Sequence, residues 1–431
     1  MIIRKTDKII DEHYQKTGRA LLLTGARQVG KTFSVRSLAE RKGWQLVEMN
    51  FLLQPETINI VQGAKDVQDL LLRISAYAKQ PMVKGKTLLF FDEVEEFPDI
   101  ITWVKAIVDD GSYPLILSGS LLGVELKNIR SIPVGYMDEL QMFPCDFEEF
   151  IQAVGIQRNI IDHLRESWEK GEKVDDYIHQ KMMSLVNLYL LVGGMPAAVQ
   201  TYLDTNDMQR VIEVQKSILS QYKMDIARYD ANEKLYINDI FDLIPPELNA
   251  KNKRFILKNL NEHFKFSRHE NSFIWLRDAD MALPTFNANE PRTPLLLSRC
   301  SNLFKLFQND VGLLASQYAD GIQLRILQGE TYINFGAIYE NLVAQELHAH
   351  GWSLYYFSSK TQGEIDFLLE QDAQVIPLEV KSGKNYTRHV ALDNLLKNKD
   401  YNISRAIVLC NDNIKVVDKV IYAPIYMLLT L

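Results

Sequence analysis

The segment GARQVGKT at residues 25–32 constrains the fold of this chain more than any other feature. It follows a short apolar run, ALLLT at 20–24, and precedes apolar residues with helical spacing at Val35, Leu38 and Ala39. A strand, a glycine-rich turn and a helix in this order present backbone N–H groups that curl around phosphate oxygens at a helix N-terminus. The pattern G-x-x-x-x-G-K-[ST] in this context therefore predicts a P-loop that binds nucleotide phosphates.

Two side chains of the predicted P-loop have separate tasks. Lys31 is expected to reach the β- and γ-phosphates and to act in catalysis, and Thr32 is expected to ligate Mg²⁺. ATP and Mg²⁺ are therefore the expected cofactors. The predicted nucleotide-binding residues are Gly25, Ala26, Arg27, Gln28, Val29, Gly30, Lys31, Thr32 and Phe33.

A second apolar run, LLFF at 88–91, ends in two carboxylates, Asp92 and Glu93. This is the form of a Walker B strand, in which Asp92 would hold Mg²⁺ through water. Glu93 would orient or deprotonate the attacking water. An acidic pair at a strand end is common on its own, but here the P-loop lies upstream with room for one strand and its flanking helices between. The two motifs together predict an ATP-hydrolysing site.

Strand-like and helical patterns alternate along the first third of the chain. Strands are expected at 20–24, 45–51, 87–91 and 114–118, with helices at 66–79 and 100–109. This alternation predicts an α/β fold with a parallel sheet and helices on both of its faces.

Composition limits the rest of the chain. Its 431 residues suggest about three domains. Lys and Arg number 48 against 55 Asp and Glu, a net charge of −7, which argues against a basic coat over the whole surface. Three cysteines far apart form no disulfide framework, and no charge-free apolar run is long enough to cross a bilayer. We expect a cytoplasmic protein with no membrane partner.

Further along, the pattern changes twice. Residues 140 to 245 look mostly helical, and Pro245-Pro246 is expected to end that stretch. Residues 247 to 325 mix short helical segments with a strand-like run at 273–276. The last hundred residues return to α/β character, with a helix expected at 336–349 and strands at 353–357, 363–369, 375–381 and 405–410.

Six short motifs occur in a fixed order: GARQVGKT, FFDEV, LSGS, FPCDFEEF, GGMPAAV and EVKSG. With them the chain resembles a large prokaryotic family of AAA-type ATPases usually described only as ATP-binding proteins. The resemblance implies an AAA-type P-loop ATPase domain at 1–150, a helical region at 151–230 and a winged-helix-like domain at 231–325. It also implies a restriction-endonuclease-like α/β domain, similar to PD-(D/E)XK nucleases, at 326–431.

The resemblance also implies a polar sensor after the strand at 114–118. Ser118, in the sequence LSGS, is our candidate for touching the γ-phosphate or the attacking water. A plain turn after a strand is the alternative interpretation of the same residues.

The nuclease-like domain is expected to carry its own site. Segments 363–369 and 376–381 look like adjacent strands, and alternation places Glu379 and Lys381 on one face of the second. If that face coincides with the face that carries Asp366, then Asp366 and Glu379 converge on a divalent metal. Lys381 would then stabilise charge or steer a nucleophilic water.

The resemblance adds Glu340, in the helical segment GAIYENLVAQEL, as the acidic residue that completes this metal site. One position departs from the nuclease pattern, because Ile365 rather than proline precedes Asp366. That proline contributes shape and no ligand. The same constellation also fits a centre that binds DNA or a metal without catalysis.

A local basic stretch at 249–268 holds six Lys and Arg against one Glu. Lys251, Arg254 and Lys258 would share one face of a helix, which in a winged-helix-like context would contact DNA phosphates. A solvated helix face is the alternative.

Three functions follow from these observations. The first, which the sequence leads us to prefer, is an ATP-driven protein whose nuclease-like domain engages DNA. The second is a nucleotide-dependent regulatory switch that binds a protein partner and carries a catalytically inactive nuclease-like domain. In either case the chain can form a homo-oligomer. A small-molecule kinase is a weaker third, because it leaves the large C-terminal half unexplained.

Overall fold

The computed structural model describes residues 2–120, 134–229, 231–250, 253–256, 266–318, 325 and 336–431. These residues form two compact units. The N-terminal unit comprises Ile3–Phe143 together with the short segment Asp278–Asp280. The C-terminal unit is built from Pro144–Arg277 and Met281–Leu431.

The N-terminal unit contains a five-stranded sheet whose strands run in the order β2-β3-β4-β1-β5, all parallel. The strands are β1 (Ala20–Thr24), β2 (Gln45–Asn50), β3 (Thr87–Asp92), β4 (Leu115–Ser118) and β5 (Met137–Gln141). Every residue of β1, β3 and β4 is buried. Strands buried on both faces are nearly continuous apolar runs, which is why the sequence predicted these three.

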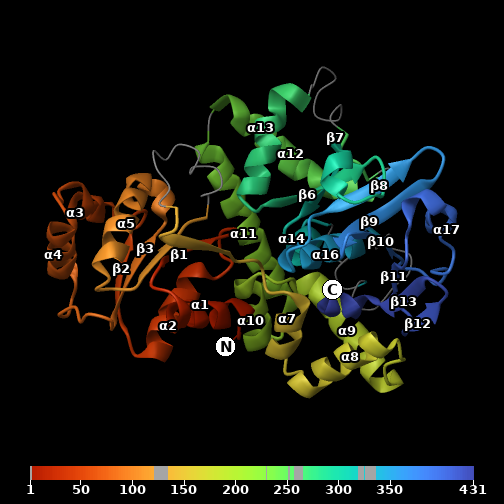
Figure 1. The fold of residues 1–431 in the computed structure, drawn as a ribbon, viewed down its shortest axis with the longest axis horizontal. Helices are drawn as coiled ribbons and strands as arrows, with labels where there is room; N and C mark the ends of the chain where they lie inside the picture. Colours follow the sequence, from red (N-terminus) through yellow and green to blue (C-terminus); the bar gives the residue numbers. More distant parts are fainter. Residues whose placement is uncertain are drawn as a thin grey trace. The chain divides into compact units, whose positions relative to one another are not determined.

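Helices cover both faces of this sheet (Figure 1). They are α1 (Lys5–Lys16), α2 (Lys31–Lys42), α3 (Ile58–Gln62), α4 (Val67–Tyr77) and α5 (Ile101–Asp110). Leu89 and Phe91 of β3 pack in one core with residues of α4 and α5. The alternate residues Leu88 and Phe90 are also fully buried, on the other face of the strand. The predicted parallel α/β sheet with helices on both faces is confirmed.

Strand order brings the predicted motifs to one edge of the sheet. The P-loop follows β1, Asp92 ends β3 and Ser118 ends β4. Because β4 lies between β1 and β3, Ser118 stands next to both the P-loop strand and the Walker B strand. Parallel strands end at the same edge, so this arrangement follows directly from the topology.

The edge strand β5 was not predicted. Its residues, MDELQ, are only partly buried, so they form no continuous apolar run. It pairs with β1 from Ala20↔Met137 to Thr24↔Gln141. Its end therefore lies beside the start of the P-loop.

Helices make up much of the C-terminal unit (Figure 1), and the mostly helical character predicted for 140–245 and the helix predicted at 336–349 are confirmed. In chain order they are α7 (Phe147–Ala153), α8 (Arg158–Lys170), α9 (Asp176–Val192), α10 (Pro196–Thr205), α11 (Met208–Arg228), α12 (Ala231–Asn249), α13 (Phe266–Asp278), α14 (Val311–Ser316), α16 (Gly336–Ala349) and α17 (Val390–Lys397). Over the described ranges, no single helix has the length and apolar content to cross a membrane. Helices α9 and α10 have that length and apolar content only when taken together, and the chain bends by 118° between them.

The C-terminal unit also contains an eight-stranded mixed sheet in the order β12-β13-β11-β10-β9-β8-β6-β7. Its strands are β6 (Ala282–Ala288), β7 (Arg299–Gln308), β8 (Tyr355–Ser359), β9 (Gly363–Gln371), β10 (Gln374–Val380), β11 (Ala406–Cys410), β12 (Lys415–Val417) and β13 (Val420–Pro424). The helix α16 packs against β6, β7 and β10. Strands β8 to β11 correspond to the four predicted at 353–410.

This sheet crosses the expected boundary between 325 and 326. Strand β6 pairs in parallel with β8, and β7 pairs with β6. The range 231–325, expected to form a separate winged-helix-like domain, therefore contributes two strands to the same sheet as 355–424. Its helices belong to the same compact unit.

Two local predictions were wrong. The run at 273–276 lies inside α13 rather than in a strand, since a short apolar run does not distinguish a buried helix from a strand. Pro245 and Pro246 lie inside α12 rather than at its end. The fully buried side chains of Ile244 and Leu248 flank the two prolines, so burial of this face outweighs the missing N–H groups.

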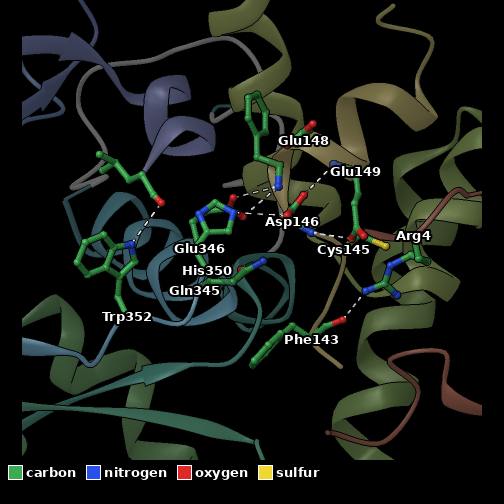
Figure 2. Close-up of polar contacts among 12 residues, drawn as sticks. Arg4, Phe143, Cys145, Asp146, Glu148, Glu149, Gln345, Glu346, His350 and Trp352 are labelled. Atoms are coloured by element: carbon green, nitrogen blue, oxygen red, sulfur yellow. Dashed lines mark hydrogen bonds and ion pairs between the residues drawn. The ribbon is translucent and has the colours of Figure 1, made fainter. Parts of the chain in front are cut away.

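The motif FPCDFEEF forms the start of α7 and a buried polar junction (Figure 2). Asp146 caps the helix by accepting from the N–H of Glu149, and Glu149 reaches back to the N–H of Asp146. Both carboxylate oxygens of Glu346, on α16, accept from the N–H of Phe147 at 3.0 and 3.1 Å. His350 lies 3.5 Å from Asp146. This motif therefore joins α7 to α16.

The motif GGMPAAV has a geometric role. A Cβ on Gly194 would lie 2.0 Å from the carbonyl oxygen of Cys145, so only glycine fits there. The N–H of Gly194 donates to buried Asp310 at 2.6 Å. Burial raises the pKa of Asp310 to about 6, although several backbone N–H groups oppose the shift. The turn between α9 and α10 therefore depends on close backbone contact.

Candidate functional site

The P-loop connects β1 to α2 in the conformation that the sequence predicts. Gly25 has φ of 125° and Gly30 has φ of 101°, both in the region that favours glycine. A Cβ on Gly25 would lie 2.1 Å from the carbonyl oxygen of Met142, just after β5. Helix α2 begins at Lys31, so the loop delivers its N–H groups to a helix N-terminus.

Lys31 is buried and folded back onto this loop. Its Nζ donates to the carbonyl oxygens of Gly25 at 2.8 Å and Ala26 at 3.0 Å. Burial lowers the pKa of Lys31, and the carboxylates of Glu93 and Glu95 oppose the shift. A phosphate group would give this ammonium a stronger partner than two neutral carbonyls.

The remaining loop residues differ in exposure. Ala26 and Val29 are buried, Gln28 is exposed, and Phe33 is 53% exposed on α2. The buried guanidinium of Arg4 donates to the carbonyl oxygen of Val29 at 2.9 Å and to that of Phe143 at 2.7 Å. The second contact is drawn in Figure 2. Arg4 therefore fixes the backbone of the P-loop at Val29 and links it to Phe143. The sequence did not predict this role.

Asp92 is the centre of the polar network at the sheet edge. Its Oδ2 accepts from the Thr32 hydroxyl at 3.1 Å and from the side-chain amide of Asn50 at 3.0 Å. Its Oδ1 accepts from the Ser118 hydroxyl. Four side chains from α2, β2, β3 and β4 thus converge. The structure brings Ser118 to Asp92, and its role as a sensor stays a prediction.

This network fits Mg²⁺ bound together with a nucleotide. The P-loop hydroxyl of Thr32 and the strand-end carboxylate of Asp92 lie within hydrogen-bond distance; Thr32 would ligate Mg²⁺ directly and Asp92 through water. Mg²⁺ typically takes one or two protein oxygens and completes its shell with phosphates and water. In the described part of the chain, no group of three or more His, Cys, Asp or Glu side chains is arranged to hold a metal by itself. The site therefore suits a metal that arrives with its nucleotide.

Glu93 follows Asp92 in the left-handed conformation, with φ of 55°. Its pKa is raised to about 8 by burial first and then by the carboxylates of Glu95 and Asp92, while Lys31 opposes the shift. A side-chain base with a pKa near neutrality is suited to accept a proton from water. The role of Glu93 as the base stays a prediction.

Two further residues at this edge were not predicted. The hydroxyl of Ser120 donates to Glu95 at 2.9 Å and lies 3.5 Å from Glu93. Asn50 is the last residue of β2, next to β3. The position of Asn50 at the end of a predicted strand was a usable signal, whereas Ser120 needed the loop geometry.

The second predicted constellation also comes together, in the C-terminal unit. Glu340 lies on α16, Asp366 on β9 and Glu379 on β10. Asp366 accepts from the N–H of Val380 at 2.8 Å, and Lys381 pairs with Glu379 at 2.7 Å. Burial raises the pKa of Glu379 to about 8, with Asp366 adding to the shift and Lys381 opposing it.

Lysines engage the carboxylate that the resemblance assigned to the metal. Lys305, on β7, is fully buried and lies 3.5 Å from Glu340, and Lys253 pairs with the other oxygen of Glu340. Burial raises the pKa of Glu340, with Asp366 adding to the shift and the two lysines opposing it. Both carboxylate oxygens of Glu340 therefore face lysine ammonium groups.

The basic stretch differs from the predicted helix where it is described. Residues 253–256 are not helical, and Arg254 donates to the hydroxyl of Ser358 on β8. Lys253 is turned toward Glu340. Lys251 and Lys258 lie outside the described residues, so the shared DNA-binding face predicted for Lys251, Arg254 and Lys258 stays a prediction.

Residues 17–151 match the model of an AAA domain family. Residues 183–323 and 335–428 match two families described only as domains of unknown function, DUF8612 and DUF4143. Together with the sheet order and the P-loop, the first match defines the N-terminal unit as an AAA-type P-loop ATPase domain, the class that binds and hydrolyses nucleotides. The matches to the other two regions assign no activity.

Several solved structures are similar to the chain. The Walker-type ATPase PABY2304 of Pyrococcus abyssi is 13% identical, with 74% of this chain and 96% of that one covered at a TM-score of 0.45. RuvB of Thermotoga maritima is 14% identical (68% and 88% covered, TM-score 0.29), and Cdc6p of Pyrobaculum aerophilum is 12% identical (75% and 93% covered, TM-score 0.26). No curated protein sequence matches. With TM-scores below 0.5, these likenesses carry no argument about function.

Proposed function

We propose that the chain hydrolyses Mg-ATP at the N-terminal unit and that its nucleotide state sets the state of the C-terminal unit, which binds a protein partner. The observation that carries the hydrolysis is the network in which Thr32, Asn50 and Ser118 hold Asp92 while Glu93, with its raised pKa, follows directly. This network brings the phosphate-binding loop and the proposed base, Glu93, together at one edge of the sheet.

The proposed reaction uses residues of this edge in turn. The loop N–H groups bind the phosphates, and Lys31 exchanges the carbonyls of Gly25 and Ala26 for phosphate oxygens. Thr32 and Asp92 would hold Mg²⁺, which neutralises phosphate charge when bound. Glu93 accepts a proton from the water that attacks the γ-phosphorus, while the bond from that phosphorus to the bridging oxygen breaks and ADP leaves with the electron pair.

Covalent continuity supports the coupling to the C-terminal unit. Asp280 belongs to the N-terminal unit and accepts from the side chain of Gln141, at the end of β5, at 2.8 and 2.9 Å. Asp280 is also among the carboxylates that oppose the lowered pKa of Lys31. The chain on either side of it continues into α13 and β6. A change at the P-loop edge therefore acts on a segment that leads directly into the C-terminal unit.

The pH dependence of hydrolysis tests the role of Glu93. Glu93 accepts a proton only when it is ionised, so kcat/KM for ATP should rise with pH up to about 8, the pKa of this carboxyl. Glu95→Gln removes a negative charge that raises this pKa, so the rise should move to lower pH. Steady-state phosphate release between pH 5 and 9 measures both profiles. A Glu95→Gln profile that moves to higher pH would contradict Glu93 as the base.

A second candidate function is metal-dependent cleavage of DNA by the C-terminal unit. The convergence of Glu340, Asp366, Glu379 and Lys381 favours it. The ion pairs that Lys253 and Lys305 make with Glu340 oppose it. Because Lys253 and Arg254 of the basic stretch face other residues of the unit, we favour a protein partner over DNA.

A further inference from the structure

The buried ammonium group of Lys305 is the feature that the proposed function leaves unexplained. It lies 2.8 Å from Glu364, 3.5 Å from Glu340 and 4.0 Å from Asp366. The lysine side chain is 0% exposed, whereas the ordinary position of a lysine is at the surface. Burial alone would lower the pKa of Lys305, but the carboxylates of Glu340, Asp366 and Glu364 outweigh it and raise the pKa. Lys305 therefore places an ammonium group among three carboxylates.

Ammonium groups nearly balance the carboxylates here. Lys253 pairs with Glu340 and Lys381 with Glu379, in addition to the contacts of Lys305. The cluster consists of three ammonium groups against four carboxylates, namely Lys253, Lys305, Lys381, Glu340, Glu364, Asp366 and Glu379. With all seven groups ionised, the formal charge of the cluster is −1 without a metal.

A divalent cation does not fit this arrangement. A metal needs several oxygens at about 2.0 to 2.6 Å that converge on one point. Here one oxygen of Glu340 faces Lys253 and the other faces Lys305, and one oxygen of Asp366 accepts from Val380. No set of three ligating side chains in the described ranges is arranged to hold a metal. A metal placed among these oxygens would also face the ammonium of Lys305 at close range.

We propose that Lys305 is the built-in counterion of this cluster, standing where a divalent metal would otherwise bind, and that the centre is a metal-independent ion-pair network rather than a nuclease site. It ties β7, β9, β10 and α16 of the C-terminal unit together around the buried Lys305. This inference concerns the C-terminal unit alone and holds whether or not the N-terminal unit hydrolyses ATP.

Replacing the lysine tests the proposal. In the full-length, nucleotide-free protein, Lys305→Met should lower Tm on the order of 10 °C, because it leaves buried carboxylates without their cation. MnCl₂ at millimolar concentration should then raise the Tm of Lys305→Met and leave that of the wild type unchanged. Lys415→Met, on the exposed strand β12, is the matched control and should show neither effect. An equal Mn²⁺ response in wild type and Lys305→Met would overturn the proposal.

Two further measurements keep the proposal testable if Lys305→Met does not fold. Lys305→Met combined with Asp366→Asn removes one charge of each sign and should recover stability without a response to Mn²⁺. Wild type and Asp366→Ala should leave plasmid and linear DNA equally intact with Mg²⁺ or Mn²⁺, with or without ATP. Cleavage by the wild type that Asp366→Ala loses would contradict the proposal, because it would show an active metal centre at these carboxylates.

Discussion

Glu93→Gln is expected to bind ATP as the wild type does and to lose turnover by about 10²- to 10⁴-fold, the usual contribution of a general base. The substitution keeps the size of the side chain and removes its ability to accept a proton. It leaves the contacts of Thr32, Asn50 and Ser118 with Asp92 in place. The expected effect is therefore on kcat rather than on affinity.

Nucleotide affinity by calorimetry and phosphate release under saturating Mg-ATP separate the two quantities. Glu96→Gln, a substitution of a neighbouring exposed carboxylate, is the matched control and should retain turnover. Equal turnover by wild type and Glu93→Gln would remove Glu93 from the reaction.

Lys31→Ala is expected to weaken ATP binding by roughly 10- to 150-fold, the range expected for loss of a charged hydrogen bond, and to abolish measurable turnover. The ammonium is already at the loop, held by the carbonyls of Gly25 and Ala26. Its loss leaves the loop N–H groups but removes the cation that meets the β- and γ-phosphates.

Calorimetric titration with ATP in the presence of Mg²⁺ measures this loss. Lys8→Ala, whose side chain is 83% exposed on α1, is the control and should bind ATP normally. Unchanged affinity in Lys31→Ala would contradict the assignment of the phosphate site.

The sequence predicted the N-terminal site well because its determinants are local. Strands β1, β3 and β4 are buried on both faces, so each is a continuous apolar run, and the parallel topology then carries their polar ends to one edge. Strand β5 was not predicted, because its residues are only partly buried and show no clear alternation between buried and exposed side chains. Asn50 and Ser120 depend on which strands are neighbours, which the motifs do not specify.

The C-terminal site shows the limit of such prediction. Asp366, Glu379 and Glu340 were predicted to converge, and they do. Lys305 was missed, although a lysine within the apolar run LFKLF is an unusual residue for a buried strand. Its meaning depends on β7 lying in the same sheet as β9 and β10, a pairing between distant segments that no local pattern reveals.

The central claim is that the nucleotide state of the N-terminal unit sets the state of the C-terminal unit. Hydrogen exchange of the full-length Glu93→Gln protein, with and without saturating Mg-ATP, tests it most directly, and Lys31→Ala under the same conditions is the control. We predict that Mg-ATP changes exchange both at the P-loop and in the C-terminal unit of Glu93→Gln, and in neither place in Lys31→Ala. Protection confined to the P-loop edge, with the C-terminal unit identical in both states, would contradict the claim.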